Sequence, residues 1–557
     1  MALLGTAKRE FKIEKRYLNI PIKNGAPKRT VTTLVDGRVA VKNNIELANS
    51  EPDWWAPMEV SEWRGKTITL RVDRLPNDSR ALSSIEQGDL IKDAENFYHE
   101  PLRGQFHFSP MHGWNNDPNG LVFYKGEYHL FFQHNPYGWG SGNKHWGHAV
   151  SRDLVHWQEL GDALAPDELG QMYSGSAVVD WKNTSGLGQP DHPAQVLVYT
   201  AAGKPTVQCL ASSTDGRNYT KFGGNPVMNQ ITKGNRDPKV FWHEPTKKWV
   251  MCLYVELLGQ NGKVDETGRQ AKEPSIHFLS SPNLKDWTMM SQTKGFFECP
   301  DLFELPMDGD ATRMKWVLVA ASSEYMVGTF DGMKFTPETE KLPGHRGLGL
   351  YAAQTFNDIP AGDGRRIQIG WFKTETKGMP FNQSMSLPLE LKLISTSDGP
   401  RLTWAPVKEL AGLRAKTHNV GSATLKTGSA NPLAREKAEL VEMRAEFEPS
   451  NDSEVVFTVR GATIAYDART QELVVNGHRA PAPLGHAKQR LTIYCDRAGL
   501  EIFASEGLTY VPMPFIPNTD DLALSVQLQG GSAKFNSLEV HELKSAWTSS
   551  RTQPPMP

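Results

Sequence analysis

The sequence predicts an all-β fold, in which a five-bladed β-propeller is followed by a C-terminal β-sandwich and preceded by a small N-terminal β domain. Three observations lead to this prediction. A polar turn that ends in an aromatic residue recurs after apolar strands, strand starts recur roughly every 50–60 residues, and alternating strand-like runs lie on both sides of this repeated region. The repeated turns are S-R-D-L-V-H-W (151–157), S-T-D-G-R-N-Y (213–219), S-P-N-L-K-D-W (281–287) and F-D-G-M-K-F (330–335).

Residues 1–100 are predicted to form the small N-terminal β domain and a linker. Three runs alternate apolar and polar residues, as half-buried strands do. The polar stretch 78–91 is predicted to be the linker. Trp54, Trp55 and Trp63 could form a platform for a sugar, but we expect them to pack the core of this domain or its contact with the propeller. The alternating runs are 16–22, 29–35 and 66–72.

Residues 101–388 are predicted to form the propeller. Each unit reads as four strands joined by turns, and five such units fit the segment. The first strand of each blade lines the central channel of a propeller, so Asp117, Asp237 and Glu298 should meet there. The strand starts lie at Asp117, Ser176, Asp237, Cys299 and Ala353.

The C-terminal part has a different pattern, with strand-like runs typical of a sandwich. Asp496 and Glu501 are acidic but lie outside the repeated region, and we expect them to be structural. The strand-like runs are 438–448, 453–460 and 490–496. The predicted parts are a connector at 389–411 that includes P-V-K-E-L (406–410), a β-sandwich at 412–546 and a tail at 547–557.

The composition argues against two classes of partner. The net charge is -2 at pH 7 and the pI is about 6.8, so no strong field favours nucleic acid or an anionic membrane. No apolar run approaches the length of a membrane span. We therefore expect no nucleic-acid partner and no membrane partner, while the oligomeric state stays open.

The first ten residues, M-A-L-L-G-T-A-K-R-E, lack the apolar core of a signal peptide. We expect an exported protein, extracellular or periplasmic, whose signal peptide is absent from this sequence, and a cytoplasmic location stays open. Cys209, Cys252, Cys299 and Cys495 show no metal-ligand spacing, so we expect buried free thiols. No cluster of His, Asp and Glu has metal-ligand spacing either, and we expect no metal and no cofactor.

Three short motifs each place an acidic residue beside a proline and an apolar strand. In W-N-N-D-P-N-G (114–120), we expect Pro118 and Gly120 to hold Asp117 in a turn before the strand-like run 121–134. The other motifs are R-D-P-K-V-F-W (236–242) and E-C-P-D-L-F-E-L (298–305). Cleavage of a glycoside with retention needs two carboxylates about 5 Å apart, and convergent strands can supply them.

Together, these motifs resemble the signature blocks of glycoside hydrolase family 32, the invertases, inulinases and levanases. The resemblance runs from about residue 104 to 545, and the N-terminal domain looks similar to a module of some bacterial fructan-degrading members. The chain departs from the family pattern at H-R-G-L-G-L (345–350), where many members are aspartate-rich, and at Leu389, where an arginine is usual. Further matching blocks are 133–136, 146–149, 173–180, 351–356 and 364–371.

The resemblance implies a role for each carboxylate. Asp117 would be the nucleophile, Glu298 the general acid and base, and Asp237 a stabiliser of the oxocarbenium-like transition state. Asn116 and the backbone amides are expected to keep Asp117 ionised, and the pKa of Glu298 is expected to be the higher of the two. Cys299 is expected to be a packing neighbour.

The resemblance also implies a first sugar subsite. Asn116, Gln133 and Ser174 would contact the fructose, and Arg236 would donate either to the sugar or to Glu298. His134 and His148 are expected to be structural. The apolar wall would come from Trp139, Tyr173 and Trp371.

The predicted function is a retaining β-fructosidase that hydrolyses terminal β-D-fructofuranosyl linkages in fructans, levan or inulin, and in sucrose through a covalent fructosyl-enzyme intermediate. One alternative is a fructosyltransferase that makes fructooligosaccharides from sucrose. Another is a non-catalytic fructan-binding propeller, although pure binding does not require a nucleophile and an acid. The preferred linkage, and exo against endo cleavage, are left open by the motifs.

Overall fold

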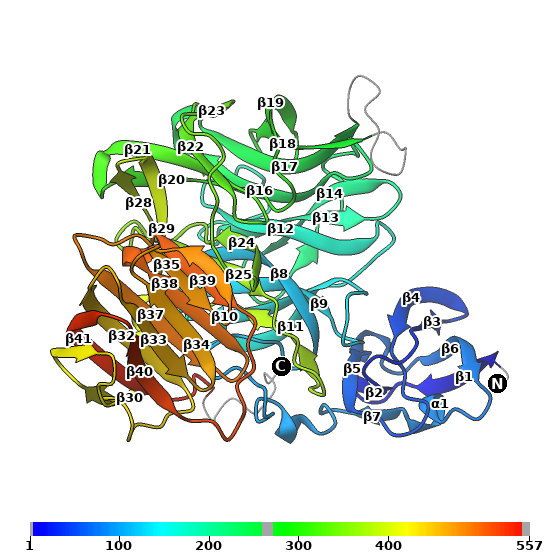
Figure 1. Ribbon diagram of the computed structural model, residues 1–557. Coiled ribbons are helices and arrows are strands. Elements are labelled where there is room, and N and C mark those ends of the chain that lie inside the picture. The colour runs from blue at the N-terminus through cyan, green and yellow to red at the C-terminus, as the bar shows by residue number, and fades with distance from the viewer. Residues whose placement is uncertain (1–3, 259–270, 548–557) are drawn as a thin grey trace.

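The computed structural model describes residues 4–258 and 271–547, and it is built almost entirely of β-strands (Figure 1). In these residues there is one short α-helix, α1 (Ala81–Ser84), and the remaining helical turns are of the 3-10 type. The prediction of an all-β chain is therefore confirmed. The tail predicted at 547–557 lies, except for its first residue, outside the described residues.

The N-terminal strands form two small sheets with one core between them. Trp54 and Trp55 are buried and Trp63 packs partly buried on the same core, so these rings serve packing, as expected. The four-stranded sheet has the order β1 (Leu4–Lys12), β6 (Thr67–Pro76), β3 (Arg29–Val35), β4 (Arg38–Ile45). The three-stranded sheet has the order β5 (Trp54–Glu59), β2 (Tyr17–Ile22), β7 (Glu86–Gly88).

The linker predicted at 78–91 is instead part of this N-terminal unit. It contains α1 and β7, and Leu82 is buried in the shared core. The guanidinium of Arg9, on β1, donates to the carbonyls of Leu82 and Ile85, which fixes the segment to the sheet. The prediction failed because polar composition cannot reveal that a short segment is tied down by a distant side chain.

Three blades of four consecutive strands follow in chain order, and the sheet of the first gains a fifth strand from later in the chain. The first contains β8 (Gly113–Tyr124), β9 (Glu127–Asn135), β10 (His145–Ser151) and β11 (Gln158–Leu164). The second contains β12 (Gln171–Asp180), β13 (Ala194–Ala202), β14 (Thr206–Ser213) and β15 (Thr220–Lys221). The third contains β16 (Arg236–His243), β17 (Lys248–Leu258), β18 (Lys272–Ser281) and β19 (Thr288–Lys294).

The fourth and fifth blades are joined through one parallel pairing, Met307 with Leu393. The fourth contains β20 (Asp301–Met307), β21 (Asp310–Val319), β22 (Tyr325–Phe330) and β23 (Phe335–Pro337). The fifth contains β24 (Leu350–Thr355), β25 (Arg366–Phe372), β28 (Leu389–Thr396) and β29 (Gly399–Pro406). The short strands β26 (Phe381–Asn382) and β27 (Ser384–Met385) pair with β8 and β25, respectively.

The fifth blade corrects the connector predicted at 389–411. β28 and β29 pair with each other, and β28 pairs with β25, so 389–406 form the outer half of the blade. Leu389, Leu391 and Leu393 are all buried in the propeller core, and this alternation is the physical reason why the segment is a strand. Leu389 is thus a packing residue.

After the 3-10 helix η4 (Lys408–Leu413), the chain forms a sandwich of two antiparallel sheets around its own core. The first sheet has the order β30 (Arg414–Asn419), β41 (Ser532–Leu543), β32 (Val441–Pro449), β37 (Gln489–Asp496), β38 (Gly499–Ala504), β39 (Thr509–Met513), and β31 (Ala423–Lys426) pairs with β41. The second has the order β36 (His478–Pro481), β35 (Glu472–Val475), β34 (Ala462–Asp467), β33 (Glu454–Val459), β40 (Leu524–Gln529).

The divergent segment 345–350 lies against this sandwich. The amide of Arg346 donates to the carbonyl of Tyr510, and the amide of Gly349 donates to the carbonyl of Pro512, both on β39. A Cβ at Gly347 would come within 2.0 Å of the Pro512 carbonyl oxygen, so close backbone approach requires glycine there. The departure from the family pattern therefore falls at a contact between the fifth blade and the sandwich.

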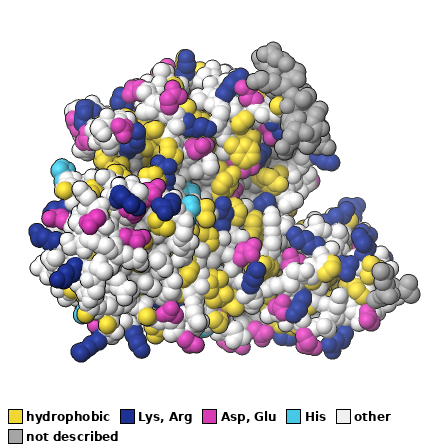
Figure 2. Space-filling view, in the orientation of Figure 1, with side chains coloured by type: hydrophobic (Ala, Val, Ile, Leu, Met, Phe, Trp, Pro, Cys, Tyr) yellow, Lys and Arg dark blue, Asp and Glu magenta, His cyan; other side chains and the backbone are white. Residues whose placement is uncertain are grey.

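The surface carries both signs of charge. Lys and Arg side chains are interspersed with Asp and Glu over the face seen in Figure 2, without a large area of one sign. Over the ranges 4–258 and 271–547, no helix combines the length and apolar character needed to cross a membrane. Cys209, Cys252 and Cys495 are buried free thiols, as expected, whereas Cys299 is partly exposed.

Candidate active site

The innermost strands of three blades are bulged at the same end. The pairing of β8 with β9 skips from Asn115 to Pro118, and the pairing of β16 with β17 skips from Arg236 to Lys239. The pairing of β12 with β13 skips Ser174 in the same way. A bulge leaves residues unpaired and re-aims their side chains, which is how these strands present polar groups at the channel mouth.

The bulge corrects the turn predicted around Asp117. The motif lies inside β8, not before it, and Asp117 is one of the residues that the ladder skips. Pro118 has no N–H to donate to a ladder, which favours a bulge at this point. Asp237 and Glu298 have positive φ angles of 62° and 55°, so their backbones also depart from regular strand geometry.

The three predicted carboxylates meet around Cys299. Asp117 Oδ2 accepts a hydrogen bond from Ser174 Oγ at 2.6 Å and lies 3.7 Å from Cys299 Sγ. Asp237 Oδ2 accepts from the Cys299 amide at 3.1 Å and lies 3.5 Å from the same sulfur. The thiol therefore sits between two carboxylates, in closer contact than the packing role expected for it.

Glu298 is held by two other side chains. Its Oε1 accepts from Arg236 Nη2 at 2.5 Å and from Nε at 3.1 Å, and its Oε2 accepts from the Tyr351 hydroxyl at 3.0 Å. The Arg236 guanidinium also lies over the Tyr254 ring, at 4.5 Å from its centre. Of the two options predicted for Arg236, the structure has the one in which it donates to Glu298.

Burial is the largest influence on the pKa values of Asp117 and Asp237. It raises the pKa of Asp117 above the ordinary range, against the opposing effects of Lys144 and Ser174. It also raises the pKa of Asp237 to about 7, although the positive charge of Arg236 acts to lower that pKa. The direction for Asp117 is opposite to the one expected, because burial outweighs the hydrogen bonds from Ser174 and the Cys299 thiol, which take the place of Asn116 and backbone amides among the described residues.

Lys144 and Tyr351 were missed by the sequence analysis. The Lys144 ammonium lies 4.8 Å from the centre of the Trp114 ring and 5.5 Å from that of Tyr173. Asp117 and Asp237 raise its pKa while burial, the larger effect, lowers it. The available signals were only positional: Lys144 directly precedes the strand of the 146–149 block, and Tyr351 opens the 351–356 block.

Two of the predicted sugar-contacting residues, Gln133 and Asn116, have buried side-chain oxygens. Gln133 is 1% exposed and donates to the Met172 carbonyl at 2.8 Å. The side-chain oxygens of Gln133 and Asn116 are buried and find no hydrogen-bond partner within the described residues. Such orphaned acceptors are costly, and hydroxyl groups of a bound ligand could satisfy them.

The predicted wall consists of partly buried rings. Trp371 lies edge-on to Trp114 and Tyr351, with ring centres 6.2 Å and 6.0 Å apart. Trp139 is held by its indole N–H, which donates to the Phe381 carbonyl at 3.2 Å. The Tyr173 ring lies near the Lys144 ammonium, which also lies near the Trp114 ring. The rings and the carboxylates thus belong to one end of the propeller channel.

The two histidines from the family blocks have protein partners. His134 contacts Asp162 at 2.6 Å and the His112 carbonyl at 2.9 Å, while His148 contacts His129 at 3.0 Å and stacks on Phe131. These contacts give both rings a structural role. Within the described ranges, no group of three or more His, Cys, Asp or Glu side chains is arranged to hold a metal ion.

Comparison with known proteins gives two family matches, one over the propeller and one over the sandwich. Residues 107–406 match the glycosyl hydrolases family 32 N-terminal domain, and residues 409–542 match the glycosyl hydrolases family 32 C terminal. The chain is 38% identical to the levanase of Bacillus subtilis (strain 168), over 81% of this chain and 72% of that protein. It is 31% identical to the extracellular exo-inulinase inuE of Aspergillus niger, over 81% and 96%.

The fold is also shared with a solved structure. The crystal structure of exo-inulinase from Aspergillus awamori superposes with a TM-score of 0.70 at 26% identity, covering 81% of this chain and 100% of that one. The family matches begin at residue 107, so the N-terminal sheets lie outside them.

Proposed function

The chain belongs to glycosyl hydrolase family 32, and from that premise we propose that it is a retaining β-fructosidase that hydrolyses terminal β-D-fructofuranosyl linkages in fructans and sucrose. It is a glycoside hydrolase. The observation that carries the proposal is the meeting of Asp117, Asp237 and Glu298, from three blades, around one cysteine.

In the first step, the Asp117 carboxylate attacks the anomeric carbon of the fructosyl unit while Glu298 donates its proton to the leaving oxygen. Ser174 and the Cys299 thiol donate to Asp117 and fix its attacking oxygen. Arg236 and Tyr351 fix the Glu298 carboxyl in the same way. The bond to the leaving group breaks as the ester bond to Asp117 forms.

In the second step, Glu298 accepts a proton from water, and that water attacks the fructosyl carbon and releases Asp117. Asp237 does not exchange a covalent bond. It lies beside the reacting groups, where hydrogen bonds to the sugar hydroxyls would tighten as charge develops in the transition state. Lys144 offsets part of the negative charge that the three carboxylates concentrate at this end of the channel.

The first subsite would be built by the surrounding polar and aromatic groups. Asn116 and Gln133 present buried oxygens that lack partners in the described protein, and they suit the hydroxyls of a furanose. Trp371 and Trp139 would exclude water and strengthen these hydrogen bonds.

The substrate classes are taken from the relatives. Similar proteins include a levanase and exo-inulinases, so we propose levan and inulin, together with sucrose, as substrates. Since the exo-inulinases among these relatives are named as extracellular enzymes, we also propose that the protein acts outside the cytoplasm.

The test is a product profile with sucrose, inulin and levan offered separately to wild type, Asp117→Asn and Glu298→Gln. Wild type should release free fructose, and each substitution should lower turnover by about three orders of magnitude or more. Asp36→Asn, at an exposed aspartate of the N-terminal unit, is the matched control and should be fully active.

The other outcomes separate the alternatives. Longer oligosaccharides from sucrose would identify a fructosyltransferase, because a sugar hydroxyl would then have replaced water in the second step. Absence of turnover with all three substrates, with binding retained, would identify a binding propeller. Near-normal activity of Glu298→Gln on sucrose would refute its assignment as the acid.

A further inference from the structure

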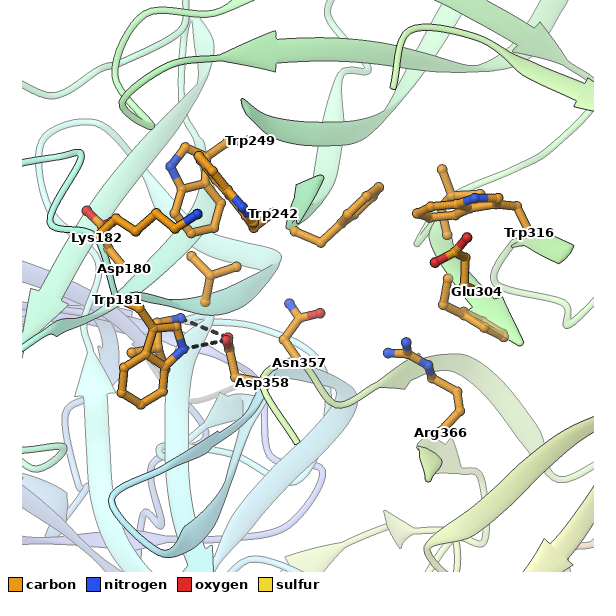
Figure 3. A pocket seen from close by; sticks show the side chains of 15 residues that line it. Asp180, Trp181, Lys182, Trp242, Trp249, Glu304, Trp316, Asn357, Asp358 and Arg366 are labelled. Atoms are coloured by element: carbon orange, nitrogen blue, oxygen red, sulfur yellow. Dashed lines mark hydrogen bonds between the residues drawn. The ribbon is translucent and has the colours of Figure 1, made fainter. Parts of the chain in front are cut away.

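The propeller has a cavity of about 350 Å³ at the far ends of its inner strands (Figure 3). The carboxylates lie near the beginning of β16 and just before β20, whereas the cavity is lined by the end of β16, by later residues of β20 and by the residues after β24. Asp237 and Trp242 are both on β16, and a strand of that length separates them by roughly 16 Å. The cavity is therefore distinct from the candidate active site.

Four tryptophans line this cavity. Figure 3 shows the rings of Trp181, Trp242, Trp249 and Trp316 around one space. Trp242 and Trp249 lie edge to face, with centres 5.1 Å apart. Trp181 is 62% exposed, although a large apolar ring is normally covered.

The exposed Trp181 ring and the partly buried Trp242 ring are both fixed by hydrogen bonds. The Trp181 indole N–H donates to Asp358 Oδ1 at 2.9 Å, and the other oxygen of Asp358 accepts from the Val179 amide at 2.9 Å. The Trp242 indole N–H donates to Glu244 at 2.5 Å, and the Lys182 ammonium lies 4.6 Å from the centre of that ring. Rings held in this way lose little freedom when a ligand stacks on them.

Polar groups complete the lining. Asn357 and Arg366 point into the space in Figure 3. Asn357 is anchored by donating to the carbonyls of Ala177 and Val240, and Arg366 has a buried Nε without a hydrogen-bond partner among the described residues. An unpartnered buried donor beside a cavity marks a place for an acceptor from a ligand.

Charged side chains of both signs line the cavity, which argues for a neutral ligand. Lys182 and Arg366 lie there together with Asp180, Glu304 and Asp358, so a charged ligand would meet both signs. Flat aromatic faces beside well-placed hydrogen-bonding groups suit a molecule with apolar C–H faces and many hydroxyls. That combination is the chemistry of a carbohydrate.

We propose that this cavity is a second, non-catalytic carbohydrate site that binds a segment of fructan through stacking on Trp181 and hydrogen bonds to Arg366 and Asn357. The identity of the sugar rests on the proposed function. Binding at this end of the channel holds the polymer on the enzyme while chain ends reach the carboxylates, and it raises the effective concentration of those ends.

The experiment is a calorimetric titration of Asp117→Asn with a fructotetraose, since this variant should bind without turnover. Two sites are expected. Asp117→Asn combined with Trp181→Ala should retain one site and lose the other, or weaken it by about tenfold or more. Trp181→Phe keeps an aromatic face and should retain both sites, and Leu90→Ala, at an exposed apolar residue of the N-terminal unit, is the matched control.

A kinetic measurement supports the titration. Trp181→Ala in the otherwise native enzyme should raise KM for the polymer several-fold with kcat unchanged, and it should leave kcat/KM for sucrose unchanged. A single site in Asp117→Asn, or two sites that persist in the Trp181→Ala combination, would overturn the proposal. If wild type hydrolyses no fructan, the proposed function fails, but a Trp181-dependent site in the titration would still support this inference.

Discussion

The N-terminal sheets and the C-terminal sandwich both pack against the propeller, on opposite sides of the view in Figure 1, but by different means. The sandwich shares a continuous hydrophobic core with the blades, through Tyr494, Phe503 and Tyr510. The N-terminal unit has a separate core, to which the propeller contributes only Tyr137 among the described buried residues.

The contact between the propeller and the sandwich contains a buried cluster of one histidine and two carboxylates. His107, just before the first blade, contacts Asp496 at 2.8 Å and Glu501 at 2.9 Å, and all three side chains are 0–1% exposed. Asp496 also accepts from the amides of Gln105 and Phe106. The structural role expected for Asp496 and Glu501 is confirmed, and it consists of joining two domains.

The contact with the N-terminal unit is polar and lies at the active-site end. Glu46 Oε2 accepts from the Trp139 amide at 3.2 Å and from the Gly25 amide at 2.9 Å. Asn44 and Asn143 exchange two hydrogen bonds, each between the backbone of Asn44 and the side chain of Asn143. This interface therefore positions the loop that carries Trp139, whereas the sandwich interface holds the fold together.

The largest effect is expected from Asp496→Ala. The substitution removes a buried carboxylate that contacts the His107 ring and accepts from four backbone amides, so the free energy of unfolding should fall by about 3–5 kcal/mol. Urea unfolding measures this. Glu506→Ala removes an exposed ion pair with Arg490 and should cost less than about 1 kcal/mol. If Asp496→Ala and Glu506→Ala lowered the free energy of unfolding equally, the expected difference between buried and exposed ion pairs would be wrong.

The stability of the protein should depend on pH through His107, which lies at the contact between the propeller and the sandwich. Burial lowers the pKa of His107, but hydrogen bonds to Asp496 and Glu501 outweigh it and raise the pKa to about 9. A raised pKa stabilises the folded state below the unfolded value of about 6.5, and this contribution, on the order of 3 kcal/mol, is lost as pH rises through 9.

Thermal unfolding between pH 6 and pH 10 checks this expectation. The midpoint of wild type should fall more steeply over this range than that of His107→Gln, which has no titrating ring at this position. His134 has a raised pKa in the same window, and it remains in both proteins, so its contribution cancels in the comparison. Parallel curves would show that His107 does not carry the effect.

At the other interface, Glu46→Ala should act on activity. It deprives two amides of their acceptor and frees the Trp139 loop, so kcat/KM for sucrose should fall by roughly three- to tenfold. Glu46→Gln keeps an acceptor oxygen and should retain most of the wild-type kcat/KM for sucrose. If stability falls by as much as in Asp496→Ala while activity is unchanged, the positioning role is wrong.

The smallest effect is expected from Lys28→Ala, at a residue of the N-terminal unit that contacts the same loop. The Lys28 ammonium donates to the Ser141 carbonyl at 2.5 Å, but the contact is exposed, so its loss should change stability by about 0.5 kcal/mol or less. The kcat/KM for sucrose should stay within about twofold of wild type. A loss equal to that of Glu46→Ala would show that the whole loop, not the buried carboxylate, governs the site.

Much of the fold and of the site could be predicted because the signals are local. The repeated polar turns and the spacing of strand starts indicated five blades, since each blade repeats the same strand pattern. The motifs around Asp117, Asp237 and Glu298 indicated the carboxylates, because each lies beside its own proline and strand. The polar stretch 78–91 and the segment 389–406 were misassigned, because composition does not report which segments find partners.

The sequence by itself determined the strand content, the repeat and the three acidic motifs. Only the tertiary structure decided that Cys299 would sit between two carboxylates, that Lys144 would lie near them, and that Trp181 would line a cavity at the far ends of the inner strands. The physical reason is that strand periodicity is written in neighbouring residues, whereas these contacts join side chains from different blades. Their distances depend on how each inner strand bulges and how the blades close around the channel.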